Sequence, residues 1–286
     1  MKRYSIPLIT VLITTLACGG YSEPVSTVLV IEDVSPTEVP TAPPTATAVP
    51  TATALPTSTP TKAPEPTLVL PTPVVRSTSV TTPAVIARYD SSWETIKGST
   101  FDLGFDTKAN LLTLTLKQPG LWLNNSQGGA VYRNTNGNFK ITAIVKATKS
   151  TTPTDPPGNR IHLGGLIVRN PAGTTENYVH IVVGNAENRL AIEAKNTTNN
   201  VSQYDTLSWT SGSAELRLCR VGSDINLYRR AVNATTWLLA TTYTRADFPA
   251  SLQVGASIYS ATAPDLRLTF ENLRIEEVRE KGECER

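Results

Sequence analysis

Apolar and polar residues alternate in short runs along the last two thirds of the chain, and Gly, Asn and Pro turns separate these runs. In the run 111–116, leucine and threonine alternate over the last five positions. A period of two is typical of a strand that buries one face. Similar runs cover 139–145, 165–169, 178–183, 190–195, 216–220, 225–229, 252–258 and 266–275. No segment keeps a helical spacing, so we expect an all-β fold of about ten strands in two packed antiparallel sheets, a sandwich or jelly roll.

The N-terminal segment has a different pattern, which is typical of an export signal. Lys2 and Arg3 precede an apolar run over 6–16, which is shorter than the roughly 20 residues of a membrane-spanning helix. The run ends in Leu16-Ala17-Cys18-Gly19-Gly20, which resembles the lipobox of bacterial lipoproteins, although Thr15 stands where that motif usually has leucine. The resemblance implies that residues 1–17 are a signal peptide and that Cys18 is lipidated. The alternative is an ordinary cleaved signal beside an incidental cysteine, and both alternatives predict an exported protein.

Proline, threonine and alanine dominate the next segment. Thirteen of the 21 prolines lie between residues 24 and 83. Such a composition cannot build an apolar core and favours an extended polyproline conformation. We therefore expect residues 18–86 to be a disordered linker, either a spacer that lifts a domain off the membrane or a plain tether. The folded sandwich domain is predicted over 87–279, and a charged tail over 280–286.

The charge balance argues against one class of partner. The formal net charge is +2, from 26 Lys and Arg against 24 Asp and Glu. Two of the basic residues, Lys2 and Arg3, lie in the predicted signal peptide, so the mature chain would be neutral. No dense basic cluster is present, and nucleic acid is therefore a poor candidate partner.

Several short motifs follow one another in a recognisable order within the predicted domain. They include Gly120-Leu-Trp-Leu-Asn124, Gly129-Ala-Val-Tyr-Arg133, Asn177-Tyr-Val-His180 and Leu216-Arg-Leu-Cys-Arg-Val-Gly222. Over roughly 93–275 the chain resembles the regulation-of-enolase-type domain, a family of poorly known function in the concanavalin A-like lectin/glucanase superfamily. The resemblance implies a jelly roll whose concave face often binds glycans. It supplies no catalytic residues.

Strand alternation also identifies the polar residues that oppose the apolar face of each strand. If these strands share one sheet, its outer face carries Arg169, Tyr178, His180, Glu193, Lys195, Arg217 and Gln253. Trp122 and Tyr132 would add stacking surfaces from a neighbouring loop or strand. Paired donors and acceptors beside aromatic rings suit sugar hydroxyls, so a glycan or cell-envelope polysaccharide is the candidate ligand. The alternative is a solvated face, because water alone selects polar residues there.

Catalysis is less favoured than binding. Glycoside hydrolysis needs two carboxyl groups, and hydrolases of the superfamily commonly carry them two residues apart on one strand. Here Glu193 is followed at that spacing by Lys195, and Glu215 by Arg217. We therefore favour a non-catalytic surface binding module. The alternatives are a polysaccharide hydrolase acting through Glu193 and a structural or protein-interaction module of the envelope.

The remaining chemistry concerns metals and thiols. His162 and His180 do not have zinc-ligand spacing, and the sequence predicts no cofactor. Asp102, Asp106 and Asp265 leave a structural calcium site open. Cys219 and Cys284 could form a disulfide that pins the tail, as export permits, although two free thiols are the favoured interpretation.

Overall fold

The computed structural model of the protein describes residues 85–286. The predicted signal peptide, the predicted lipidation site Cys18 and nearly all of the linker 18–86 lie outside the described residues and stay predictions. The two helical elements in this range are single 3-10 turns, η1 (Gly98–Thr100) and η2 (Lys281–Glu283). Within residues 85–286, no helical element has the length and apolar character that crossing a membrane requires.

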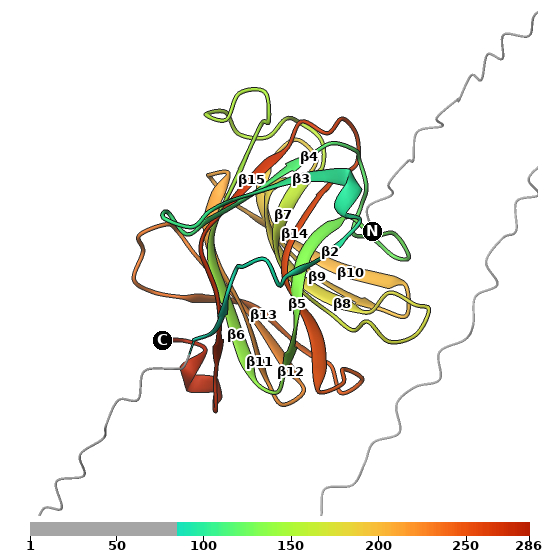
Figure 1. Ribbon diagram of the computed structural model, residues 1–286, viewed down its shortest axis with the longest axis vertical. Helices are drawn as coiled ribbons and strands as arrows, with labels where there is room; N and C mark the ends of the chain where they lie inside the picture. The colour runs from blue at the N-terminus through green and yellow to red at the C-terminus, as the bar shows by residue number, and fades with distance from the viewer. Residues whose placement is uncertain (1–84) are drawn as a thin grey trace, which may run out of the picture. The chain divides into compact units, whose positions relative to one another are not determined.

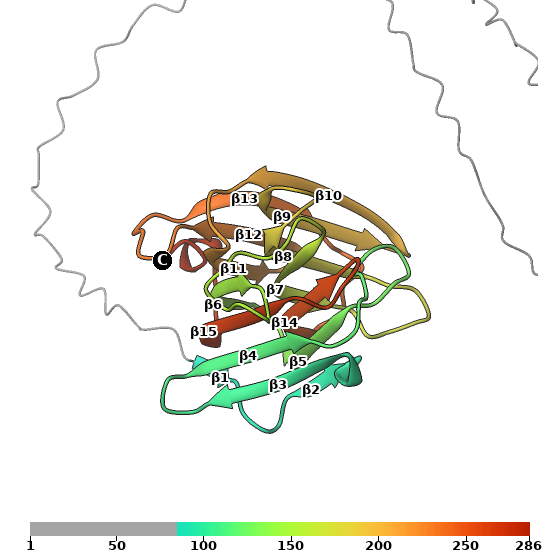
Figure 2. The ribbon, with the colours of Figure 1, turned by 90° about the horizontal axis from the view of Figure 1, so that it is seen from above.

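The described residues form two antiparallel sheets packed face to face (Figures 1 and 2). The order of strands in sheet A is β13-β12-β11-β6-β15-β4-β3, with β1 also paired to β15. These strands are β1 (Val85–Arg88), β3 (Phe101–Asp106), β4 (Leu111–Leu116), β6 (Phe139–Thr148), β11 (Ser213–Val221), β12 (Asp224–Arg230), β13 (Leu238–Thr244) and β15 (Arg267–Glu277).

The order of strands in sheet B is β10-β9-β8-β7-β14-β5-β2. These strands are β2 (Glu94–Ile96), β5 (Gly129–Asn136), β7 (His162–Arg169), β8 (Tyr178–Asn185), β9 (Leu190–Thr198), β10 (Val201–Ser208) and β14 (Ser251–Ser260). The prediction of an all-β, two-sheet antiparallel sandwich is therefore confirmed.

The main core lies between the two sheets and follows the alternation of the sequence. In β4, Leu112, Leu114 and Leu116 are buried, while the residues between them are half-buried. In β9, Ile192 and Ala194 likewise point into the core. Each fully buried leucine or isoleucine contributes about 1.5–3 kcal/mol through removal of its apolar surface from water. The two sheets are therefore held together mainly by these facing apolar rows.

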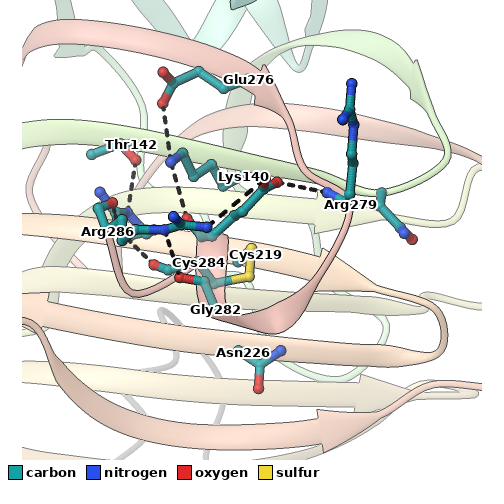
Figure 3. The surroundings of a disulfide bond; sticks show 12 residues. Lys140, Thr142, Cys219, Asn226, Glu276, Arg279, Gly282, Cys284 and Arg286 are labelled. Atoms are coloured by element: carbon teal, nitrogen blue, oxygen red, sulfur yellow. Dashed lines mark hydrogen bonds and ion pairs between the residues drawn. A yellow bond between two sulfur atoms is a disulfide. The ribbon is translucent and has the colours of Figure 1, made fainter. Parts of the chain in front are cut away.

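A disulfide joins Cys219 of β11 to Cys284, just after η2, with their Cα atoms 5.9 Å apart (Figure 3). The interpretation of two free thiols, which the sequence favoured, is wrong on this structure. The bridge places the C-terminal segment on the outer face of sheet A. There the Nζ of Lys140 donates to the main-chain carbonyl of Glu283 at 3.1 Å. The sequence offered this pairing as one alternative but could not decide it, because the two cysteines are 65 residues apart.

Candidate functional site

Most of the predicted ligand-binding residues come from sheet B and lie on its outer face. Arg169 pairs across the strands with both Tyr178 and Gln253, and His180 pairs with Lys195. Residues directly opposite each other in a ladder point to the same side of the sheet. Glu193 is two residues from Lys195 on β9, so it shares this face. Strands β7, β8, β9, β14 and β5 thus bring together every predicted strand residue except Arg217.

Arg217 is the exception, and its predicted place beside the others is wrong. It lies on β11 in sheet A and is 3% exposed. Its guanidinium donates to the main-chain carbonyls of Cys284 and Arg286 and packs over the ring of Trp237, with 4.0 Å from Cζ to the ring centroid. Alternation tells which side of its own strand a residue occupies, but the sheet is set by the pairing of β11 with β6, which is long-range and leaves no local pattern.

The two aromatic residues Trp122 and Tyr178 do not form an open stacking surface, because both are fully buried. Their rings pack edge to face at 5.1 Å. With five neighbours they form a second apolar cluster on the outer face of sheet B, made of Trp122, Ala130, Leu163, Ile167, Tyr178, Val182 and Tyr259. Trp122 belongs to the loop of residues 117–128, between β4 and β5, which we call the covering loop. This loop covers part of the outer face that the sequence predicted to bind a ligand.

Three more predicted residues are engaged in bonds within the protein. Arg169 donates from Nε and Nη2 to the two carboxylate oxygens of Glu176, at 2.9 and 2.8 Å. Its Nη1 donates to Oε1 of Gln253 at 2.8 Å. The hydroxyl of Tyr132, a residue that is 8% exposed, donates to Glu94 at 2.9 Å. These groups fix the packing of sheet B, and the same bonds occupy the donors that a ligand would need.

Glu193 is the centre of a buried polar network. Its Oε1 forms an ion pair with Nζ of Lys195 and accepts a hydrogen bond from the hydroxyl of Tyr259, each at 2.9 Å. The same oxygen lies 3.4 Å from Nε2 of His180, whose ring stacks on that of Tyr259. No hydrogen bond from a described residue reaches the other oxygen, Oε2. The carboxylate is therefore held firmly through one oxygen and has acceptor capacity left on the other.

The protonation states of this network follow from burial and its contacts. Burial acts to raise the pKa of Glu193, but the hydrogen bond with His180 and the charge of Lys195 outweigh it and lower the pKa to about 2. Burial lowers the pKa of His180 to about 4 despite the neighbouring carboxylate. At neutral pH Glu193 is thus an anion and His180 is neutral, so Nε2 of His180 carries the proton that faces Glu193.

A pocket of about 290 Å³ opens beside Glu193 at the β9–β10 edge of sheet B. Its lining consists of Ile161, Ala186, Glu187, Arg189, Glu193, Tyr204 and Thr206. Tyr204 and Thr206 pair across the ladder with Lys195 and Glu193, so they project from the same face. Tyr204 is 55% exposed, and its ring centroid lies 5.0 Å from Nζ of Lys195. This pocket places an ionised carboxylate, a hydroxyl and an accessible aromatic ring together.

Tyr204 and Thr206 were missed because β10 shows no apolar alternation. It is an edge strand, and five of its eight residues are half-buried or exposed polar side chains with no apolar row between them. One signal was present in the sequence. Asn199 and Asn200, both with positive φ (49° and 68°), form the tight turn after β9. An Asn-Asn pair of this kind favours a two-residue hairpin, which would have set 204 opposite 195.

The aspartates considered for calcium have separate partners. Asp102 pairs with Lys117 at 2.9 Å, Asp106 accepts two main-chain amides in its own turn, and Asp265 accepts the amides of Ser150 and Thr151. Within residues 85–286, no group of three or more His, Cys, Asp or Glu side chains is arranged to hold a metal ion.

Comparison with known proteins supports the fold and leaves the family unassigned. No protein-family model matches the chain, and no curated protein matches it in sequence. A Saccharomyces cerevisiae protein of unknown function has a similar structure, with a TM-score of 0.52 and 14% identity over 64% of this chain and 98% of its own. This match supports the sandwich fold.

Structural neighbours with lower TM-scores include lectins and a xylosidase. Basic winged bean lectin with Tn-antigen gives a TM-score of 0.45 and 10% identity over 68% of this chain and 95% of its own. A xylan β-1,4-xylosidase from Bacillus halodurans gives 0.47 and 14% over 59% of this chain, but only 33% of its own. At these scores neither neighbour assigns a ligand or an activity to this chain, and membership of the regulation-of-enolase-type family stays a prediction.

Proposed function

We propose that the domain is a non-catalytic carbohydrate-binding module whose site is the pocket between Glu193 and Tyr204. One observation carries this proposal: an ionised carboxylate, fixed through one oxygen, lines a pocket beside a tyrosine ring that is 55% exposed. A pyranose ring has apolar faces and hydroxyls at its edge. An accessible aromatic ring can stack on the face, while an acceptor at the side takes the hydroxyl protons.

The pocket is preorganised for such a ligand. Lys195 and Tyr259 already hold the carboxylate of Glu193 in place, so a sugar hydroxyl would meet a fixed acceptor and little side-chain freedom would be lost on binding. Thr206 and Arg189 line the same space and add polar side chains to it. These features favour recognition of a neutral, hydroxyl-rich ligand.

The charge state of Glu193 argues against one catalytic role, that of proton donor. The proton donor of a glycoside hydrolase needs a raised pKa, whereas the pKa of Glu193 is lowered to about 2. An acid that is fully ionised at neutral pH has no proton to give to a glycosidic oxygen. We therefore place Glu193 in the role of hydrogen-bond acceptor.

The rest of the proposal concerns where this module works. The Cys219–Cys284 disulfide is typical of exported proteins in an oxidising compartment. Together with the predicted signal peptide, lipidated Cys18 and Pro/Thr-rich linker, it supports a lipoprotein that presents the domain at the outer surface of a cell. The finer assignment to the regulation-of-enolase-type family belongs to this proposal as well.

The test is a pull-down and glycan-array screen of the chain with and without a change at Tyr204. Tyr204→Ala should weaken binding about tenfold or more, which corresponds to roughly 1.4 kcal/mol of lost stacking, while Tyr204→Phe keeps the ring and should bind nearly as well. The control is Leu238→Ala on β13 of sheet A, where the leucine is 49% exposed. Binding to no polysaccharide, or equal binding by the Tyr204→Ala chain, would overturn the proposal.

A second variant addresses the carboxylate. Glu193→Gln keeps the shape of the side chain but removes the charge that Lys195 and Tyr259 contact. We expect it to lose glycan binding and also some stability, because Lys195 is then a buried cation without its partner. Since Tyr204 is exposed, its variants should leave the unfolding midpoint unchanged, and they separate loss of the site from loss of the fold.

A further inference from the structure

We infer that the pocket receives the terminal residue of a glycan chain and not a stretch from its interior. This inference rests on the proposed function and adds the class of ligand. It follows from which sides of the pocket are closed, from its volume and from where its aromatic ring meets solvent.

The covering loop closes the pocket along the direction of the strands. Two residues beyond Glu193 on β9, Lys195 donates from Nζ to the main-chain carbonyl of Trp122 at 2.8 Å. One step farther, the amide of Asn124 donates to Oγ of Ser202 at 2.7 Å, and the amide of Ser202 donates back to Oδ1 of Asn124 at 3.1 Å. These bonds fasten the loop to β9 and β10, so a glycan chain cannot continue past Lys195 over this face.

The side of the pocket toward the middle of sheet B is closed as well. His180 is fully buried and Tyr259 is 1% exposed, and their rings are stacked with centroids 5.7 Å apart. Ile161 packs against the apolar cluster that contains Tyr259, and it also lines the pocket. A ligand therefore meets a wall of packed side chains on this side and cannot cross from β9 to β8.

The volume of the pocket fits one sugar unit. The pocket has a volume of about 290 Å³. This is just below the lower end of the range for small-molecule sites. A hexose has a dozen non-hydrogen atoms, so one ring fills the space and the following units must lie outside it.

The accessible side is the edge of the sheet. Tyr204 lies on edge strand β10 and is 55% exposed. Among the residues that line the pocket, it alone has an aromatic ring. The turn that carries Glu187 and Arg189 borders the pocket where β8 ends and β9 begins. A terminal ring would enter between this turn and Tyr204, and the rest of the chain would leave over β10 into solvent.

The experiment compares chains of different length and different numbers of ends. Xylo-, cello- and laminari-oligosaccharides of one, two, four and six units are titrated calorimetrically into the full chain. For the series that binds, we expect the affinity of the dimer and the hexamer to agree within about twofold. A rise of tenfold or more from dimer to hexamer would overturn the inference, because it is the signature of an open cleft with several subsites.

A competition assay gives an independent result. Xylan, cellulose-derived and laminarin polymers compete for binding either intact or cut to an average of about four units, at equal sugar mass. A terminal pocket predicts that potency rises with the number of chain ends, and a cleft predicts that it falls. If no probe binds in a Tyr204-dependent manner, the proposed function fails and this inference fails with it. An affinity that rises with chain length contradicts this inference alone.

Discussion

Breaking the Cys219–Cys284 bridge should destabilise the sandwich, and the size of this effect depends on the number of residues between the two cysteines. The bridge closes a segment of 65 residues, for which the loop-closure entropy of the unfolded chain corresponds to about 4 kcal/mol. In guanidinium, with a slope of roughly 4 kcal/mol per molar for a domain of this size, Cys284→Ser should lower the unfolding midpoint by about 1 M. The thermal midpoint should fall by roughly 8–16 °C.

The measurement is guanidinium unfolding of the unaltered chain with and without reductant, beside the Cys284→Ser chain. Reduction should shift the first curve onto the second, and reductant should leave the variant unchanged. Arg286→Ala serves as the control, because it alters the same segment and leaves the disulfide in place. Midpoints that agree within about 0.2 M in all four samples would refute the reasoning, as would alkylation of both cysteines without reductant.

Two further predictions concern buried charge in sheet B. Arg169→Met leaves the carboxylate of Glu176 buried without its bidentate partner, which should cost about 3–5 kcal/mol of unfolding free energy; a loss under 1 kcal/mol in chemical denaturation would contradict this. Stability should also fall with acid. His180 takes up a proton near pH 6.5 in the unfolded chain but only near 4 in the folded protein. Glu193 titrates near 4.5 when unfolded and near 2 when folded. Both groups therefore contribute to the free energy of unfolding at high pH, and these contributions disappear as the pH falls. Thermal midpoints should drop from pH 6.5 downward, His180→Asn should flatten the upper part of this drop, and midpoints that stay constant from pH 7 to 3 would contradict the account.

The parts of the fold that sequence could predict are those with one face buried. Leu112 and Leu114 on β4, and Ile192 and Ala194 on β9, show the alternation because the core selects apolar residues at every second position. The edge strands β10 and β13 were missed, since much of their surface reaches water and no such selection acts on them. The alternation therefore gave the architecture, but it left out the edge strands of both sheets, β2 and β3 included, and also β1 and β5.

The site was predicted only in part, for two physical reasons. Glu193 was found because it alternates with buried residues of its own strand. The covering loop has no period, so the burial of Trp122 and the covering of the predicted polar face could not be read from the sequence. Arg217 was misplaced because the choice of sheet depends on long-range pairing. Tyr204, the accessible aromatic ring of the pocket, lies on a strand that the pattern did not reveal.

The central claim is that glycan binding takes place at the Glu193–Tyr204 pocket of sheet B. Its most direct test is the amide NMR spectrum of the isotope-labelled chain during addition of a fragmented polysaccharide that the chain retains. The account predicts that shifts concentrate on β9 and β10 around Glu193, Tyr204 and Thr206, and on the turn at Arg189. Shifts confined to sheet A, or none at saturating sugar, would contradict it.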